Sequence, residues 1–223
     1  MKNVNRKSKP ESLVNYASTW KDLLLKAKDE GKSFDYLLNN YRKDDIRETL
    51  EKMYSDDYGC YCCYCEGQID EVSFEQIEHR KPKSIYPEYA FDWDNLHLAC
   101  QKCNTNKRDK WNEVNEILDA VLDPIKDHLG YEVDFHGVYR LTLSNRGITT
   151  VEHADLNRAS LLKGRTRVYQ ETMKAVDNIR SLGDDPRTYT DIRMLRDFVS
   201  GKYGSVIDWI INKELNNSEV LVK

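Results

Sequence analysis

The chain has 223 residues, of which 32% are charged, and a mean hydropathy of −0.75. No run approaches the roughly 18 apolar residues of a spanning helix, which excludes a membrane-embedded fold. A net charge of −4 and a pI of about 5.8 exclude a surface coated in basic residues, so any nucleic-acid contact must come from a local site or a partner. No apolar segment follows the basic stretch Met1–Lys7, so we expect no secretory signal and a cytoplasmic location.

The first predicted region, residues 1–55, is helical. Apolar side chains recur at three- and four-residue spacing, as on one face of a helix, at Leu13, Tyr16, Trp20, Leu24 and Ala27. Gly31 is expected to end this helix, and Ser33 to cap a second one over Phe34–Asn40. A third helix, capped by Asp44 or Asp45, would turn inward Ile46, Leu50 and Met53. We expect a helical cover on the core; the alternative is a surface that docks a partner.

The next region, residues 56–122, contains all the cysteines: Cys60, Cys62, Cys63, Cys65, Cys100 and Cys103. Disulfide scaffolds spread their cysteines over a secreted chain, whereas paired CxxC units in a cytosolic chain favour a metal site. A CxxC turn places two thiolates on one edge of a tetrahedral zinc ion, and two such turns complete its four ligands. The sequence therefore predicts a structural zinc site, the alternative being six free thiols packed as small hydrophobes.

One of the two cysteine pairs is ambiguous. Cys100 and Cys103 form the second pair, but Cys60 with Cys63 and Cys62 with Cys65 both satisfy the spacing of the first. We favour Cys62 and Cys65 as the ligands. Four protein ligands leave no open position for water, which is why this zinc would be structural.

Polar residues between and after the cysteine pairs suit phosphodiester chemistry, which needs a base for water and a cation against the scissile phosphate. His79 can take a proton near neutral pH, and Glu78 can offer a hard oxygen to Mg²⁺. His97 follows Asn95 by two positions, so strand alternation would put both on one face. For His97 a structural role is favoured, and a rival role in the site is the alternative.

These residues resemble the HNH nuclease motif in its zinc-stapled form: Glu78-His79, then Asn95, then Cys100-x-x-Cys103-Asn104-x-x-Lys107. The resemblance implies a ββα-metal unit, with two strands and a helix around one divalent ion, Mg²⁺ or Mn²⁺. It implies that His79 is the general base, that Glu78 and Asn104 are ligands of this ion, and that Asn95 orients the loop or the His79 ring. Asn104 stands where the family often has its last histidine, so the ligand set stays open.

The third region, residues 123–223, combines a small β insert with helices. Before it, residues 112–122 are predicted to form an amphipathic helix that Asp123-Pro124 stops. Residues 131–151 alternate as strands do, around Gly137 and a predicted turn over Ser144–Gly147. Helical periodicity returns from Leu156 to about Leu182, and Asp184-Asp185-Pro186 interrupts it. Two helices near 188–199 and 205–214 and a frayed tail follow. The predicted fold is thus α+β and mostly helical, built on the zinc-stapled HNH core.

A longer stretch, mostly within residues 45–170, is similar to the HNH proteins of Septu and retron antiphage systems, the PtuB family. The likeness rests on Cys62–Glu66, on Ile77-Glu78-His79-x-x-Pro82-Lys83-Ser84 and on Phe91–Leu96. It extends to Asp155-Leu156-Asn157-Arg158 with Arg165. It implies a DNA-cutting effector whose partner is a PtuA-like ABC-type ATPase, or in retron systems also a reverse transcriptase with its noncoding DNA. A tRNA target is the alternative substrate.

Phosphate contacts are expected from basic residues near the motif and on the following helix: Lys83, Lys107, Arg108, Arg165 and Arg167. For the helical residues the alternative is a solvated face. The competing function for the whole chain is a zinc-stabilised module that binds nucleic acid or protein without catalysis. A purely structural subunit of a larger complex is a third class.

Overall fold

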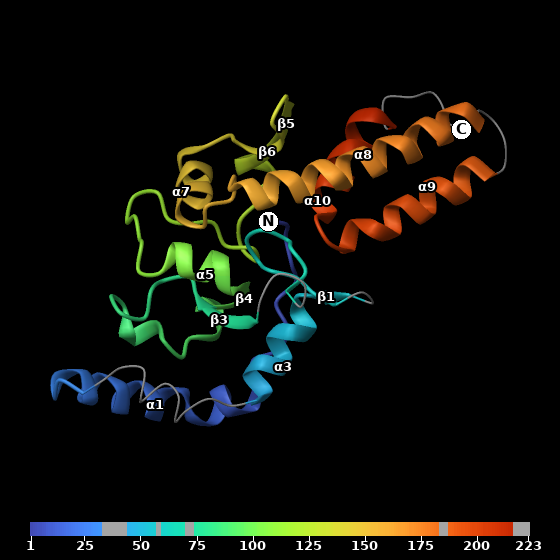
Figure 1. Ribbon diagram of the computed structural model, residues 1–223. Coiled ribbons are helices and arrows are strands. Elements are labelled where there is room, and N and C mark those ends of the chain that lie inside the picture. Colours follow the sequence, from blue (N-terminus) through green and yellow to red (C-terminus); the bar gives the residue numbers. More distant parts are fainter. Residues whose placement is uncertain (33–43, 57–58, 70–73, 183–186, 216–223) are drawn as a thin grey trace.

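The structure is a computed structural model that describes residues 1–32, 44–56, 59–69, 74–182 and 187–215 (Figure 1). Its fold is α+β and mostly helical, as predicted. The helices are α1 (Glu11–Asp29), α3 (Asp44–Met53), α5 (Gln101–Lys107), α6 (Ile125–His128), α7 (Asn145–His153), α8 (Ala159–Leu182), α9 (Arg187–Asp197) and α10 (Gly204–Glu214). Short 3-10 turns are η1 (Pro87–Tyr89), η2 (Trp93–Asn95) and η3 (Phe198–Ser200).

The strands of the described part pair only in antiparallel twos. They are β1 (Ser55–Asp56) with β2 (Gly59–Cys60), β3 (Glu75–His79) with β4 (Leu96–Cys100), and β5 (Leu129–Asp134) with β6 (Gly137–Thr142). In Figure 1, β3, β4 and α5 lie between the N-terminal helices α1 and α3 and the long helix α8. The middle of the chain is therefore flanked by helical segments from both ends.

The N-terminal helices largely match their sequence pattern. In α1 the side chains of Leu13, Trp20, Leu24 and Ala27 are buried, but Tyr16 is 50% exposed and stacks on Trp20. All three predicted residues of α3 are buried: Ile46, Leu50 and Met53. The second predicted helix, over 34–40, lies outside the described residues. Asp45, predicted as a possible cap of its own helix, instead accepts hydrogen bonds from the backbone and hydroxyl of Ser12 and so ties α3 to α1.

The β3–β4–α5 unit positions the polar motif. The strands pair so that Glu75 lies opposite Cys100 and Glu78 lies opposite His97. Every residue of β4 is buried, and α5 starts directly after it. Because β4 is a single short strand, the second cysteine pair falls at one end of the unit and Asn95, in η2, at the other.

The predicted helix over 112–122 is wrong. This segment has no helix and runs as an irregular stretch that still buries Ile117, Leu118 and Ala120. Polar side chains capture the backbone N–H groups that a helix would use: Asn112 accepts from residues 114 and 115, and Asp119 accepts from residues 121 and 122. Such local side-chain bonds compete with helix formation, which explains why apolar spacing alone misled the prediction.

Of the predicted strand-like segment 131–151, the first part forms the hairpin of β5 and β6, with Gly137 at the start of the second strand, but residues 145–151 belong to the helix α7 and the strand prediction is wrong there. Residues 144–147 do not form the predicted turn. Instead Ser144 is the N-cap of α7, and its hydroxyl accepts from the Gly147 backbone, because the same residue type serves turns and helix starts. The later helices α8, α9 and α10 agree with prediction, while Asp184–Pro186 and the tail from residue 216 fall outside the described residues.

One connected hydrophobic core joins these parts, extending from Met1 through β4 to Leu215. A buried carboxylate, Glu66, links regions far apart in sequence, since it accepts from Arg140 of β6 at 2.6 Å and from the Ser205 backbone of α10 at 2.9 Å. The boundaries at residues 55 and 122 stay predictions. Within the described residues, none of the helices has the length and apolar character needed to span a membrane.

Candidate metal centre and active site

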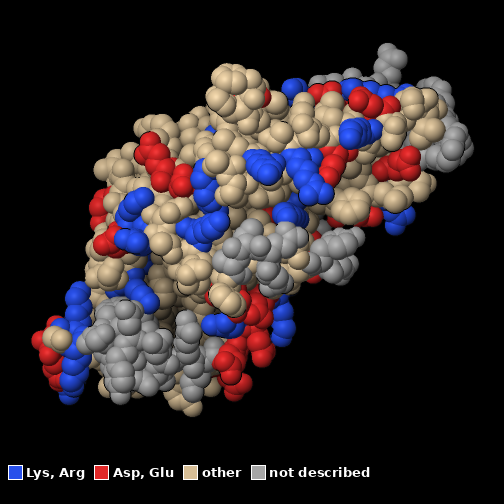
Figure 2. Space-filling model, in the orientation of Figure 1, with Lys and Arg blue, Asp and Glu red and all other residues tan. Residues whose placement is uncertain are grey.

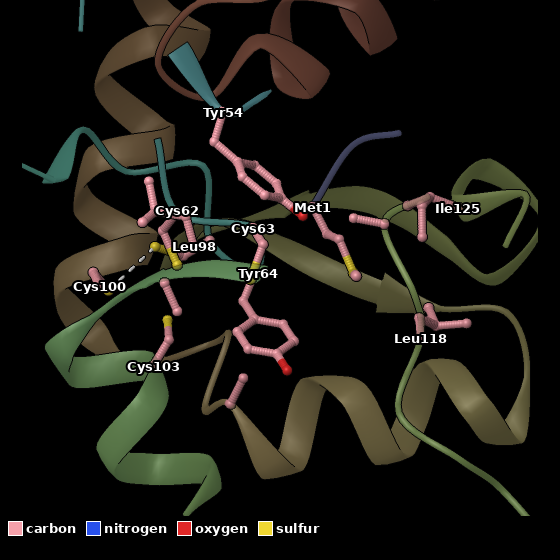
Figure 3. Packing of buried hydrophobic residues seen from close by; sticks show 14 of the residues in the cluster. Met1, Tyr54, Cys62, Cys63, Tyr64, Leu98, Cys100, Cys103, Leu118 and Ile125 are labelled. Carbon is pink, nitrogen blue, oxygen red and sulfur yellow. Dashed lines mark hydrogen bonds between the residues drawn. The ribbon is translucent and has the colours of Figure 1, made fainter. Parts of the chain in front are cut away.

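Four cysteines meet at one end of the β3–β4–α5 unit. The Sγ atoms of Cys62, Cys65, Cys100 and Cys103 all lie within 4.8 Å of one another, and all four residues are buried. Figure 3 shows Cys62, Cys100 and Cys103 pointing toward one another from the loop before β3, from β4 and from α5. Of the two possible registers for the first pair, the structure thus assembles the favoured one.

The donor set of this cluster fits zinc. Four thiol groups from two CxxC turns supply four soft ligands in a closed, buried site, as structural zinc requires. The Gly67 backbone N–H donates to the Cys65 sulfur at 3.4 Å, a contact that stabilises a thiolate. Cys60 is outside the cluster, with its sulfur 3.9 Å from the Glu51 carbonyl oxygen, and Cys63 packs in the core.

A cleft of about 630 Å³ opens beside the other end of the unit. Its lining comes from β3, from the loop after it and from α5, and consists of Ile77, Glu78, His79, Pro82, Lys83, Ser84, Asn104, Thr105 and Arg108. Three of the four predicted catalytic residues therefore share one cavity. The fourth, Asn95, supports the loop that forms its wall.

The His79 ring is held in the form that can accept a proton. Its Nε2 atom lies 3.0 Å from the carbonyl oxygen of Ala90. Because a carbonyl oxygen can only accept, Nε2 carries the hydrogen and the lone pair is on Nδ1. Burial and the positive charge of Lys83 lower the pKa of His79 to about 3, with Lys107 adding to the effect and the Ala90 bond opposing it. The ring is neutral at physiological pH.

Glu78 is more enclosed than the sequence suggested, with 1% of its surface exposed. Its Oε1 atom accepts from the ammonium of Lys107 at 2.6 Å and from the Tyr64 hydroxyl at 3.1 Å. Lys107 also donates to the His79 carbonyl oxygen at 2.7 Å and is itself 1% exposed. Sequence reasoning missed this buried ion pair. The sequence did contain a signal for it, because Lys107 lies about one helical turn after Asn104 and so points to the same side of the helix, toward β3.

Asn104 and Asn95 have different surroundings. Asn104 donates through Nδ2 to the Gln76 side chain at 2.5 Å, which leaves its Oδ1 for a ligand. Asn95 is buried and fixes the loop after β3: its Oδ1 accepts from the Lys81 backbone at 2.7 Å, and its Nδ2 donates to the carbonyls of Lys81 and Tyr89, both at 3.1 Å. Of the two expectations for Asn95, the geometry fits support of the loop.

His97 lies away from the cleft. Its Nδ1 is 2.6 Å from the Tyr54 hydroxyl, and its Nε2 is 3.8 Å from a carboxylate oxygen of Asp119. Burial lowers the pKa of His97, and Asp119 partly opposes that effect. It does not share a strand face with Asn95, because Asn95 belongs to η2 and not to β4. The geometry fits the favoured structural role.

The predicted phosphate contacts divide into two groups. Lys83 and Arg108 line the cleft, and Arg167 is exposed on α8, where it pairs with Glu171. Lys107 and Arg165 are each only 1% exposed, so the expectation that they contact phosphate does not agree with their position in the core. Arg165 and Arg167 are two residues apart on α8, so their side chains point to different sides of the helix. Figure 2 shows Lys and Arg side chains across the middle of the face over α5 and the first half of α8.

Comparison with known proteins defines the class of this site: residues 60–110, which include the cysteine cluster and the cleft strands, match the family model described as HNH endonuclease. The chain is further similar to the Septu protein PtuB of Bacillus mycoides (strain KBAB4), at 26% identity over 162 residues, covering 59% of this chain and 53% of the relative. A Septu protein PtuB of Bacillus thuringiensis is 26% identical over 129 residues, covering 56% and 48%.

The chain thus spans about half the length of the curated relatives it matches. The resemblance to HNH endonucleases and to the PtuB family, inferred above from the motif Glu78–Lys107 and from residues 45–170, is confirmed by these matches.

Proposed function

We propose that this protein is a metal-dependent HNH endonuclease that hydrolyses phosphodiester bonds in DNA, as the nuclease of a Septu-type defence complex. The observation that carries the proposal is the cleft. It unites a neutral histidine, a carboxylate and an amide with two basic residues, Lys83 and Arg108, in one open cavity. The HNH family match over residues 60–110 and the likeness to two Septu proteins support the same class.

His79 is the proposed general base. Its Nε2–H is fixed on Ala90, so Nδ1 can take a proton from a water molecule at the cleft. Asn95 fixes the loop from Lys81 to Tyr89 through its hydrogen bonds. Ala90, whose carbonyl oxygen accepts from His79, follows this loop directly. Lys83 and Arg108, at the mouth of the cleft, are placed to hold a phosphate by charge. Exposed Arg167 would extend this contact along α8.

Glu78 and Asn104 are the residues that would hold a catalytic Mg²⁺ or Mn²⁺. Both line the cleft, and a carboxylate with an amide carbonyl is the oxygen donor type these ions prefer. The protein supplies only these two side-chain oxygens from the predicted set, which suits an ion that keeps water and substrate oxygens as its other ligands. Such an ion supplies charge against the scissile phosphate.

A partner is part of the proposal. The net charge of −4 gives little overall attraction to DNA, so we infer that the nuclease acts inside a complex with an ATPase of the ABC type. In retron-type systems a reverse transcriptase with its DNA would join them. The competing function, a binding module without catalysis, predicts binding by the same complex but no cleavage.

The test is a plasmid-cleavage assay with the chain and its co-purified ATPase, using wild type, His79→Ala and the matched control His136→Ala. His136 lies at the tip of the β5–β6 hairpin, outside the cleft lining. We expect His79→Ala to lose about 10²- to 10⁴-fold in rate, since it lacks the base, while zinc content, melting temperature and DNA binding are kept. Cleavage at wild-type rate in His79→Ala would reject the assignment, and binding without cleavage by wild type would favour the binding module.

A further inference from the structure

The segment from Asp155 to Arg165 links α7 to α8 and includes the first two turns of α8. Asp155 adopts a positive φ of 49°, which turns the chain sharply between the two helices. Asn157 then accepts from the Arg140 backbone at 2.7 Å and donates back to its carbonyl at 3.0 Å. These contacts fix the segment on β6 and aim two arginines, Arg158 and Arg165, inward.

Arg158 contacts a cysteine of the cluster directly. Its Nη1 and Nη2 atoms both lie 3.5 Å from the sulfur of Cys103. The guanidinium is held in place by the carbonyl oxygens of Ala154 at 3.3 Å and Asp155 at 2.9 Å. Two N–H groups of one cation thus point at one sulfur.

Arg165 is among the most deeply buried large side chains of the described chain, at 1% exposed. Its Nη1 reaches Asn157 Oδ1 at 3.4 Å, whereas Nε and Nη2 have no hydrogen-bond partner in the part of the chain described. Burying an ionised group without a compensating charge costs several kcal/mol. Arg140, close by, has such a charge in Glu66, but no carboxylate within 4.0 Å among the described residues pairs with Arg158 or Arg165.

The cysteine cluster can supply the missing charge. Four thiolates around one divalent zinc ion carry a net double negative charge, and the cluster is fully enclosed by protein. The guanidinium of Arg158, which contacts Cys103 directly, carries a positive charge that offsets part of this negative charge. We propose that Arg158 is a counter-ion of the zinc–thiolate centre, so that the segment around it belongs to the metal site although it contributes no ligand.

A counter-ion role predicts effects on zinc binding that packing alone would not cause. N–H groups and positive charge beside a thiolate favour the ionised sulfur, so removing them should raise the pH at which protons displace zinc. Outer partners of metal ligands typically account for about 10- to 100-fold in metal affinity. A merely structural role of the segment would change protein stability without changing the electronic character of the sulfur ligands.

The experiment measures zinc affinity by chelator competition in purified, zinc-loaded full-length protein, together with the pH of half-release. Arg158→Gln is the main variant, because Arg158 is only partly buried. Arg158→Lys keeps the charge, and Arg167→Gln, exposed on α8, is the matched control for zinc affinity. Asn157→Ala loosens the segment without removing charge. Cobalt-substituted protein gives a spectroscopic measure of the thiolate ligands.

We expect Arg158→Gln to bind zinc about 10- to 100-fold more weakly, to release it at higher pH and to shift the thiolate-to-cobalt absorption band. Arg158→Lys should fall between it and wild type, and Arg167→Gln should match wild type. Wild-type zinc affinity and cobalt spectrum in Arg158→Gln would overturn the proposal. So would an equal loss in Asn157→Ala, because that result would assign the effect to packing and not to charge.

Discussion

The two ends of the β3–β4–α5 unit are built on opposite principles. At the cysteine end four sulfurs are fully enclosed and meet within 4.8 Å, so chain geometry alone completes the site. At the cleft end His79, Glu78 and Asn104 face a cavity of about 630 Å³ that is open to solvent, and the protein leaves ligand positions for other molecules. A closed site contributes to folding, whereas an open one can do chemistry.

The same contrast appears in how charge is balanced. Beside the cysteines the cation, Arg158, comes from a distant segment and has no carboxylate partner within the described residues. In the cleft the carboxylate of Glu78 is balanced locally by Lys107, three residues after Asn104 on α5. We infer that the cleft can stay ordered before any catalytic ion binds, whereas the cysteine end depends on its metal.

The largest effect is expected from breaking the closed end. Cys100→Ser should abolish zinc binding and cooperative unfolding, because structural zinc contributes on the order of 10–16 kcal/mol in small zinc modules, as much as the whole stability of many domains. Zinc analysis and calorimetry would measure this. The control is Cys60→Ser, which removes a thiol outside the cluster and should keep zinc. A zinc-free Cys60→Ser protein would contradict the register.

A smaller loss of stability is expected at the open end from Lys107→Met, which leaves the buried Glu78 carboxylate without its ammonium partner. Removing one partner of a buried ion pair typically costs about 3–5 kcal/mol. Chemical denaturation would measure the change, and Lys110→Met, exposed just beyond α5, is the control. Adding Glu78→Gln to Lys107→Met should recover part of the stability. A double variant no more stable than Lys107→Met would show that the charge is not the cause.

Asn95→Ala should have an intermediate effect on the wall of the cleft. It deletes three hydrogen bonds to the loop at Lys81 and Tyr89 and leaves partly buried backbone groups unpaired, at a cost of about 1–3 kcal/mol. We expect faster amide exchange confined to residues 80–90, with zinc retained. Amide exchange in that loop at the wild-type rate would reject the supporting role of Asn95.

The smallest expected effect depends on pH. The folded-state pKa of His79, about 3, lies below the unfolded value of 6.5, so its stabilising contribution is complete above pH 6.5 and is lost as the pH falls toward 3. At pH 5.5 the loss amounts to about 1 kcal/mol. Comparing urea denaturation of wild type and His79→Gln at pH 7.5 and 5.5 measures it. Identical pH dependence in the two proteins would mean that the ring does not titrate on unfolding.

Much of this arrangement is predictable because it depends on spacing. Two CxxC turns can close on one ion in few ways. The order Glu78-His79, Asn95, Asn104 places these residues on a strand, on the 3-10 turn before the next strand and on a helix. The face of α3 follows likewise from its apolar period. In each case local geometry fixes the outcome, so the sequence contains the needed information.

The errors have two causes. In residues 112–122 the side chains of Asn112 and Asp119 bind the local backbone and divert it from the helix that the apolar spacing predicts, and Leu118 donates its N–H to the distant Thr150 of α7. The prediction that Lys107 and Arg165 contact phosphate used charge alone, but both side chains are buried, Lys107 against Glu78 of β3. No local pattern distinguishes an arginine that meets solvent from one that meets a thiolate cluster.

The placement of Arg158 also has a consequence for biosynthesis, since it follows Cys103 by 55 residues. At elongation rates of about 5–20 residues per second, that gap corresponds to roughly 3–11 s between synthesis of the last cysteine and synthesis of its proposed counter-ion. During that interval the four thiols are still open to exchange between metals. Packing of Arg158 against Cys103 would then enclose the site.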